Sequence, residues 1–277
     1  MQVLAVAGPS DSGKTTLVES LVGRLSERGR VATVKHLRTE PTVDTEGKDT
    51  HRHRAAGADA TYGVTDDAGW FATGRERSLD ETLDHLAADY EYAIVEGYSS
   101  ADLPTVALGG RDHAGETVAT APEADALDPD TLVDAVEALE PYETLGSLVA
   151  EVKRSPDARY AGAIATFTGR VRQQEDADDD PTEYLEFEKY EGVADERMAT
   201  IREELEARDG VHEVRMYHRT GLVEDGEDIV FVVVLAGHRS EAFETVEDGI
   251  DRLKDEVPLF KKEVTVEETF WSHERPG

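Results

Sequence analysis

A glycine-rich segment near the amino terminus limits the possible folds of this chain more than any other feature. Residues 8–15 read GPSDSGKT, which matches the pattern G-x-x-x-x-G-K-[S/T] without a mismatch. The apolar run QVLAVAG precedes it, and Leu17, Leu21 and Leu25 then repeat at helical spacing. A strand, a glycine loop and a helix in this order predict a phosphate-binding loop. A glycine turn without a ligand is the less favoured interpretation, because both flanking elements fit.

The chemistry of this loop assigns roles to its side chains. Glycines let successive backbone N–H groups converge on phosphate oxygens, and the helix N-terminus adds a positive dipole. We expect Lys14 to bridge the outer phosphates and Thr15 to ligate Mg²⁺ carried by the nucleotide. Glu96 ends the strand YAIVEG, where it would hold Mg²⁺ through water or orient a ligand. The predicted nucleotide-binding residues are Gly8, Ser10, Asp11, Ser12, Gly13, Lys14, Thr15, Thr16 and Glu96.

Strand and helix signals alternate through the rest of the first half. The helix predicted at 78–89 begins with a capping box formed by Ser78 and Glu81, and Asp128 or Asp130 caps the last helix. This alternation predicts an α/β domain over residues 1–140 with a mostly parallel sheet. Strands are predicted at 31–37, 90–98 and 103–110, and helices at 14–29, 48–58, 78–89 and 128–139.

The alternation of strand and helix signals ends near Pro141. The second half predicts an α+β domain over residues 141–277. A helix at 142–155 opens this half, and an acidic segment, QQEDADDDPT, interrupts it after Arg172. We interpret that segment as a solvated loop. Strands are predicted at 160–172, 183–190, 211–221, 228–237 and 261–270, and helices at 193–208 and 240–257. The apolar stripe expected for the last helix is Phe243, Val246, Ile250 and Leu253.

The charge of the chain is extreme. Asp and Glu number 61 against 29 Lys and Arg over 277 residues, which gives a net charge of −32. The acidic excess runs along the whole chain rather than in one tail, which favours adaptation to high salt over an ordinary acidic protein. At molar salt the Debye length falls to about 3 Å, so repulsion between like charges is screened.

Composition also excludes several classes of function. There is no basic stripe for a phosphate backbone, so nucleic acid is not an expected partner. No apolar run approaches the roughly 18 residues of a membrane span, and no targeting signal is recognisable, so we expect a cytoplasmic protein. The chain has no cysteine, which excludes disulfides, thiolate metal sites and persulfide chemistry on its own side chains.

Lysines are concentrated near the carboxyl terminus. The chain has eight lysines, and Lys254, Lys261 and Lys262 lie within nine residues. Pro258 ends the helix that carries Lys254, so the chain turns back and Lys254 can lie near Lys261. Adjacent strand residues face opposite sides, so Lys261 and Lys262 are not expected to point at one ligand. A solvated basic edge is the alternative, but the scarcity of lysine elsewhere favours an anion-binding catalytic site.

Other cations accompany these lysines. Arg170 and Arg172 share one face of a predicted strand, and His238 and Arg239 lie at a strand-to-helix junction. Guanidinium and ammonium groups around one pocket are typical of sites for phosphorylated, planar substrates. His218 and Arg219 form a further pair, for which a structural turn is at least as consistent.

The first half resembles the MobB family, which is associated with attaching a nucleotide to molybdopterin. The segments GPSDSGKTTL, VKHLRTEPTVDTEGKDTHRHRAAGA and AIVEGY carry this resemblance over about residues 1–140. The residues alone leave the base open, because there is no [N/T]KxD motif; the resemblance implies GTP. It also implies that Asp44, Lys48 and Asp49 lie near the phosphates. After Gly97 the chain departs from the basic residues that are usual in the family.

The second half resembles MoaE, the catalytic large subunit of molybdopterin synthase. The segments GAIATFTGRVR, YHRTG, VVVLAGHRSEAF and DRLKDEVPLFKKE and the late Trp271 carry it over about residues 142–275. The resemblance implies a hammerhead-like α+β fold, a homodimer, and conversion of cyclic pyranopterin monophosphate to molybdopterin. Sulfur would arrive on the C-terminal Gly-Gly thiocarboxylate of a small ubiquitin-like carrier. No metal or organic cofactor is implied for this step.

The same resemblance assigns residues to the reaction. Lys254 would act as general acid or base, or as a nucleophile, and Lys261 would stabilise developing negative charge. Glu263 would orient the lysines. The implied substrate-binding residues are Arg170, Arg172, His238, Arg239, Lys262 and Glu263, with Arg170 and Lys262 as flanking contacts.

The sequence therefore predicts a fusion of a nucleotide-binding domain, with weak or no GTPase activity, and a sulfurtransferase domain. One alternative is a nucleotide-dependent adaptor whose second domain only docks a partner. A small-molecule kinase is a third option, weakened by the lack of a lid-like arginine segment near the phosphate-binding loop.

Overall fold

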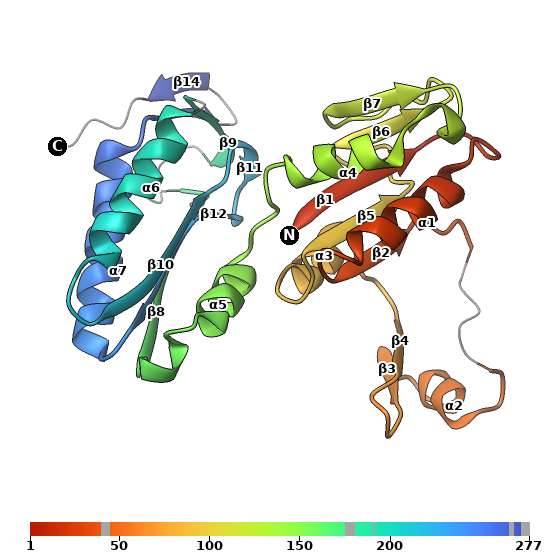
Figure 1. The fold of residues 1–277 in the computed structure, drawn as a ribbon, viewed down its shortest axis with the longest axis horizontal. Helices are drawn as coiled ribbons and strands as arrows, with labels where there is room; N and C mark the ends of the chain where they lie inside the picture. Colours follow the sequence, from red (N-terminus) through yellow and green to blue (C-terminus); the bar gives the residue numbers. More distant parts are fainter. Residues whose placement is uncertain (40–44, 175–180, 191, 266–268, 273–277) are drawn as a thin grey trace. The chain divides into compact units, whose positions relative to one another are not determined.

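The computed structural model describes residues 1–39, 45–174, 181–190 and 192–265, and the backbone of 269–272. The chain divides into two compact units, Met1–Tyr142 and Glu143–Gly277. Each unit has its own sheets and helices (Figure 1) and its own apolar cores.

A five-stranded sheet forms the centre of the first unit. Its strand order is β2-β5-β1-β6-β7, and all four pairings are parallel, which confirms the predicted α/β architecture. Parallel strands place their carboxyl ends at one edge, so the loops that follow them meet there. The strands are β1 (Gln2–Ala7), β2 (Val31–Lys35), β5 (Tyr92–Glu96), β6 (Thr105–Leu108) and β7 (Thr117–Ala121).

Helices cover both faces of this sheet (Figure 1). Successive residues of β1 point into different cores. Leu4 packs in the core beneath α1 (Lys14–Leu25) and α4 (Pro129–Glu137), whereas Ala5 packs in the core beneath α3 (Leu79–Ala87). A strand buried on both faces accounts for the unbroken apolar sequence of residues 3–7.

The predicted helix caps of the first unit are present. The Ser78 hydroxyl accepts the backbone N–H of Glu81 at 3.0 Å, and the Glu81 carboxylate accepts the backbone N–H of Ser78 at 2.8 Å. Asp128, rather than Asp130, caps α4 by accepting the N–H of Asp130 at 3.2 Å. A short 3₁₀ helix, Ala124–Ala126, precedes this cap.

A β-hairpin in the first unit was not predicted. It follows α2 (Asp49–Ala55) and pairs β3 (Ala60–Val64) with β4 (Trp70–Gly74) antiparallel. Both strands are short, and the large side chains of Tyr62 and Trp70 are exposed. The pattern of burial that reveals a strand in a sequence is therefore missing here.

Two antiparallel sheets form the second unit, as expected for an α+β domain. One has the order β10-β12-β8 and the other the order β11-β9-β13-β14. The first sheet contains β8 (Ala163–Arg170), β10 (Val211–His218) and β12 (Asp228–Ala236). The second contains β9 (Thr182–Lys189), β11 (Gly221–Glu224), β13 (Leu259–Thr265) and β14 (Thr269–Ser272).

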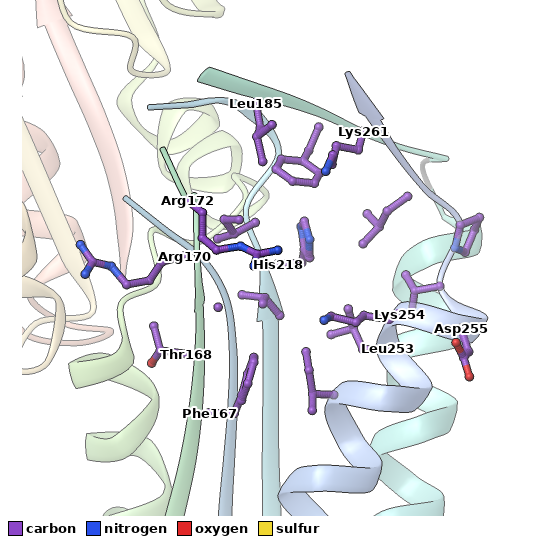
Figure 2. A pocket seen from close by; sticks show the side chains of 18 of the residues that line it. Phe167, Thr168, Arg170, Arg172, Leu185, His218, Leu253, Lys254, Asp255 and Lys261 are labelled. Atoms are coloured by element: carbon purple, nitrogen blue, oxygen red, sulfur yellow. The ribbon is translucent and has the colours of Figure 1, made fainter. Parts of the chain in front are cut away.

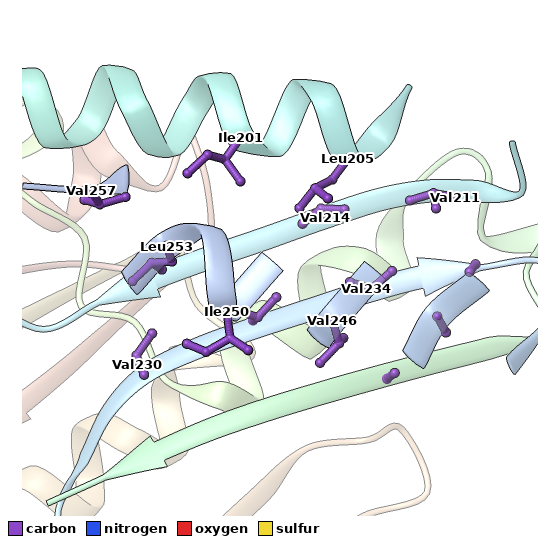
Figure 3. Packing of buried hydrophobic residues seen from close by; sticks show 14 of the residues in the cluster. Ile201, Leu205, Val211, Val214, Val230, Val234, Val246, Ile250, Leu253 and Val257 are labelled. Atoms are coloured by element: carbon purple, nitrogen blue, oxygen red, sulfur yellow. The ribbon is translucent and has the colours of Figure 1, made fainter. Parts of the chain in front are cut away.

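The three-stranded sheet is covered on both faces. On one face, α6 (Val193–Glu206) and α7 (Arg239–Glu256) pack on alternate residues of β12, including Val230 and Val234 (Figure 3). On the other, α5 (Leu145–Arg154) packs against the intervening residues of β12. A 3₁₀ helix, Ala158–Tyr160, links α5 to β8.

The apolar stripe predicted for α7 needs one correction. Val246, Ile250 and Leu253 are buried, but Phe243 is 66% exposed and Ala242 occupies the core in its place. The buried face of α7 also includes Thr245 and Gly249, so its centre is displaced from position 243, which falls at the edge of that face. Within the described residues, no helix is both long and apolar enough to cross a membrane.

Candidate functional site

The phosphate-binding loop has the backbone that its glycines allow. Gly13 has φ 83° as the N-cap of α1, and a Cβ at that position would lie 2.8 Å from the Ala124 Cβ. A Cβ on Gly8 would lie 2.7 Å from the Ser12 hydroxyl oxygen. Neither glycine can therefore be replaced without distorting the loop, whose N–H groups precede a helix and suit a phosphate.

Polar side chains of the loop are held close to it. The Lys14 ammonium donates to the Pro9 carbonyl, and the Ser12 hydroxyl donates to the same carbonyl at 3.0 Å. Thr15 donates its hydroxyl to the Glu96 carboxylate at 3.1 Å. A hydroxyl beside a carboxylate at a loop of this kind offers the oxygen donors that Mg²⁺ prefers, so the residues present fit a magnesium nucleotide.

Lys35 also contacts Glu96, which the sequence analysis did not foresee. The Lys35 ammonium lies 2.9 Å from Glu96 Oε1, and the two residues are paired in register between β2 and β5. Nothing in the sequence states that β2 and β5 are neighbours. The available signal was that both residues end apolar strands, whose carboxyl ends meet at one edge.

Three further residues, Asp44, Lys48 and Asp49, were expected near the phosphates, and two of them lie at the start of α2. Asp49 lies in the first turn of α2, where its carboxylate is 3.5 Å from Arg52, and Lys48 is the N-cap of that helix. Asp44 lies outside the described residues.

A pocket of about 840 Å³ lies in the second unit between α7 and the ends of its two sheets. Its apolar wall includes Phe167, Leu185, Phe187 and Leu253. Its polar wall contains both predicted catalytic lysines. The charged or titratable lining residues are Arg170, Arg172, His218, Lys254, Asp255, Glu256, Lys261 and Glu263.

Lys254 and Lys261 reach this pocket from different elements. Lys254 lies in the last turn of α7 and Lys261 lies on β13, and the chain turns between them at Pro258. Figure 2 shows both side chains directed into the pocket, with Arg172 directed inward from the opposite wall. Three cations around one cavity can bind an anionic group and stabilise negative charge that develops there.

Glu263 holds Lys261 in place. Its Oε2 lies 3.3 Å from the Lys261 ammonium, and its Oε1 accepts the Thr182 hydroxyl at 2.7 Å. Both charged side chains are about three-quarters buried, at 25% and 22% exposure. A carboxylate bound on both oxygens has little rotational freedom, so the ammonium keeps one direction.

Lys262 lies outside the pocket, although the resemblance implied a flanking contact. Its ammonium donates to Glu186 at 2.7 Å on the other face of β13. This hydrogen bond raises the pKa of Lys262 above its usual value. The reason is strand alternation, since Lys261 and Glu263 occupy the pocket face.

Arg170 and Arg172 differ in the direction of their side chains (Figure 2). Arg170 lines the pocket, but its guanidinium lies 3.1 Å from Asp228 and donates to the Gly226 carbonyl. Figure 2 shows it pointing away from the cavity. Arg172 is therefore the better placed of the two for a ligand.

His238 and Arg239 are distant from the pocket of their own chain. They stand at the start of α7, whereas Lys254 stands near its end. Fifteen residues of α-helix span roughly 22 Å. The sequence places these two cations at the start of a helix, but it does not indicate that the pocket lies at the other end of that helix.

His218 lines the pocket, although its role is open from the sequence alone. It is 9% exposed, its Nδ1 lies 2.7 Å from the Arg219 carbonyl, and the Phe187 ring meets it edge-on at 4.8 Å. A carbonyl oxygen can only accept a hydrogen bond, so Nδ1 is the donor in this contact and carries the proton. The signal available in the sequence was a histidine that ends a strand, which is too common to identify a site.

Comparison with known proteins defines the class of each unit. Residues 3–127 match the family model of molybdopterin guanine dinucleotide synthesis protein B, MobB, and residues 141–256 match that of the MoaE protein. The chain thus consists of a MobB-like phosphate-binding-loop domain followed by a MoaE-like domain.

One relative resembles the chain over its whole length. It is a probable molybdopterin synthase of Haloferax volcanii, 55% identical over 275 residues, which cover 99% of this chain and 100% of the relative. The chain belongs to the same family as that protein.

Two further matches each cover less than half of this chain. The molybdopterin synthase catalytic subunit of Cereibacter sphaeroides is 40% identical over 114 residues, 41% of this chain and 75% of the relative. The crystal structure of a molybdopterin synthase from Staphylococcus aureus is 31% identical, with a TM-score of 0.43; it covers 49% of this chain and 94% of that one.

Proposed function

We propose that the pocket of the second unit transfers sulfur to cyclic pyranopterin monophosphate and so produces molybdopterin. The convergence of Lys254, Lys261 and Arg172 on one half-apolar cavity carries this proposal. Apolar walls suit the flat face of a pterin, and the cations suit its phosphate. The similarity of the second unit to molybdopterin synthase catalytic subunits supports it.

The residues divide the chemistry between them. Lys254, in the last turn of α7, donates or accepts protons or attacks as a nucleophile. Lys261, fixed by Glu263, stabilises negative charge near the sulfur donor or the opening cyclic phosphate. Arg172 binds the phosphate, and Arg170 supports the pocket edge through Asp228.

The sulfur must come from another molecule, because the chain has no cysteine. The proposed donor is a small ubiquitin-like carrier whose C-terminal Gly-Gly thiocarboxylate enters the pocket. At about 840 Å³ the cavity lies in the upper part of the range of ligand sites, about 300–1,000 Å³, which leaves room for a peptide tail beside the pterin.

His238 and Arg239 enter this proposal through a homodimer of the second unit. Because they stand at the far end of α7, they can bind substrate only in the pocket of a second copy. Mixing Lys254→Ala chains with Arg239→Ala chains tests this directly. Random pairing would restore one intact site in half of the dimers, or about a quarter of wild-type activity. Two inactive variants that stay inactive when mixed would contradict shared sites.

The first unit is proposed to bind GTP with Mg²⁺ and to hydrolyse it slowly or not at all. The fit of the loop to phosphate and the neighbouring Thr15–Glu96 contact support nucleotide binding, and the MobB similarity supports the choice of GTP. Titration with GTP, GDP and ATP measures both affinity and base preference. Lys14→Ala is the control that is expected not to bind nucleotide. Equal affinity for ATP and GTP would contradict the assigned base.

Conversion of the pterin precursor with a thiocarboxylated carrier tests the catalytic proposal. Lys254→Ala is expected to lower the rate by about 100-fold or more with its Tm unchanged. Lys153→Ala is the matched control, because Lys153 is an exposed lysine of α5 that does not line the pocket. If Lys254→Ala keeps full activity, Lys254 has no catalytic role. If the wild-type chain converts no precursor, the second unit only docks a partner, and the chain is a nucleotide-dependent adaptor.

A further inference from the structure

Thr182 lies in the pocket because of an irregularity in β9. Leu185 and Phe187 of this strand line the pocket, so regular alternation would next place Glu183 there. Instead Thr182 lines the pocket and is 6% exposed, whereas Glu183 is exposed. The strand therefore changes face between residues 182 and 185.

The register of β9 against β13 shows the cause. Val264 pairs with Tyr184, but the next residue, Thr265, pairs with Thr182. Glu183 is thus an extra residue opposite an uninterrupted partner strand, which defines a β-bulge. Bulges of this kind re-aim side chains and are frequent beside active sites. Here the bulge replaces a carboxylate with a hydroxyl at the pocket.

The re-aimed hydroxyl is bound to the group that holds Lys261. Thr182 donates to Glu263 Oε1 at 2.7 Å, which leaves Oε2 for the Lys261 ammonium at 3.3 Å. Without this hydroxyl, the carboxylate could turn both oxygens toward Lys261 and draw the ammonium away from a ligand. A carboxylate from Glu183 at the same place would repel Glu263.

We propose that Thr182 is a positioning residue that acts through Glu263 to direct the Lys261 ammonium into the pocket. The proposal rests on the sulfur-transfer function assigned to this pocket. Thr182 does not touch the reacting atoms, so its removal lowers the rate of the chemical step and leaves substrate binding intact.

Three variants separate this role from packing. Thr182→Val keeps the shape of the side chain and removes the hydroxyl, Thr182→Ser keeps the hydroxyl, and Thr200→Val is the control for the same change on α6. We expect Thr182→Val to lower kcat by about tenfold, the scale expected when a catalytic group is slightly misplaced. KM for the pterin should stay within a factor of about two, and Thr182→Ser should recover most of kcat.

A second measurement follows the lysine itself. Reductive methylation with ¹³C keeps the lysine charge, and the chain has only eight lysines, so each methyl signal can be assigned by Lys→Arg substitution. Thr182→Val should move the Lys261 signal, Thr182→Ser should return it, and Thr200→Val should leave it unchanged.

The outcomes distinguish this inference from the function on which it rests. Wild-type protein that produces no molybdopterin contradicts the proposed function, and the lysine signals then still decide whether Thr182 positions Lys261. Activity that is lost in Lys261→Ala but unchanged in Thr182→Val overturns the inference alone. It is also overturned if Thr182→Ser is as slow as Thr182→Val, or if KM rises while kcat is unchanged.

Discussion

Lys261 and Lys262 are adjacent in the chain, yet their ammonium groups lie on opposite faces of β13. Lys261 lines the pocket beside Glu263, and Lys262 binds Glu186. The two side chains are equally buried, at 25% and 24% exposure. They therefore form a natural pair in which position relative to the pocket is the main difference.

Substitution of this pair is expected to give unequal effects. Lys261→Ala should lower the rate of pterin conversion by about 100-fold, because charge developing in the pocket loses a fixed cation. Lys262→Ala should stay within about threefold of wild type. Steady-state kinetics with a thiocarboxylated carrier measures both. Similar losses in the two variants would show that net charge, rather than a directed ammonium, is what matters.

The Lys262–Glu186 pair predicts a dependence of stability on alkaline pH. The hydrogen bond to Glu186 raises the pKa of Lys262 in the folded state above the ordinary 10.5. Its contribution is therefore fully present below the unfolded-state value and is lost as the pH rises through the raised value. The Tm difference between wild type and Lys262→Ala should be present at about pH 8 and should shrink as the pH rises above 10.5. A difference that does not change with pH would contradict the pair.

Lys35 is expected to tune nucleotide binding in the first unit. Its ammonium neutralises Glu96 beside the loop, so Lys35→Ala should weaken Mg²⁺-free GTP binding by roughly threefold to tenfold, the scale of one ion pair near a surface. Added Mg²⁺ should reduce the loss, because the freed carboxylate favours the metal. Arg30→Ala is the control, since Arg30 precedes the amino end of β2. Calorimetric titration in which both variants bind equally would remove Lys35 from the site.

Low salt is expected to destabilise the protein. With a net charge of −32, lowering the salt from 1 M to 0.1 M lengthens the Debye length from about 3 Å to about 10 Å, so acidic groups repel over longer distances. Tm should fall on dilution of KCl, which is preferable to sulfate because sulfate itself strengthens apolar burial. A Tm that rises on dilution would mean that the many arginine–carboxylate pairs outweigh the repulsion.

Some of these features could be predicted from local pattern alone. The caps at Ser78 and Asp128 follow from residues close in sequence, and the structure confirms them. The placement of Lys254 and Lys261 in one pocket follows from a helix that ends at a proline before a strand. In each case the relevant contact spans few residues, so spacing determines geometry.

Other features depend on pairings that the sequence does not state. The Lys35–Glu96 contact requires the order of strands in the sheet, and the placement of Thr182 requires the register of β9 against β13. The hairpin of β3 and β4 has too little burial to leave a pattern. Phe243 fits the apolar stripe expected for α7, but it lies at the edge of the buried face of that helix and is exposed to solvent.

The bulge at Glu183 also bears on which changes of length this chain can tolerate. Thr182 donates its backbone N–H to the Gln173 carbonyl at 2.8 Å, so the connection between these two residues starts and ends at one fixed point. Residues can be gained or lost between those two anchors without changing which side chains of β9 face the pocket. Loss of a single residue between Thr182 and Leu185 would instead restore a regular strand, and relatives of this protein should vary freely before that interval and keep its length constant.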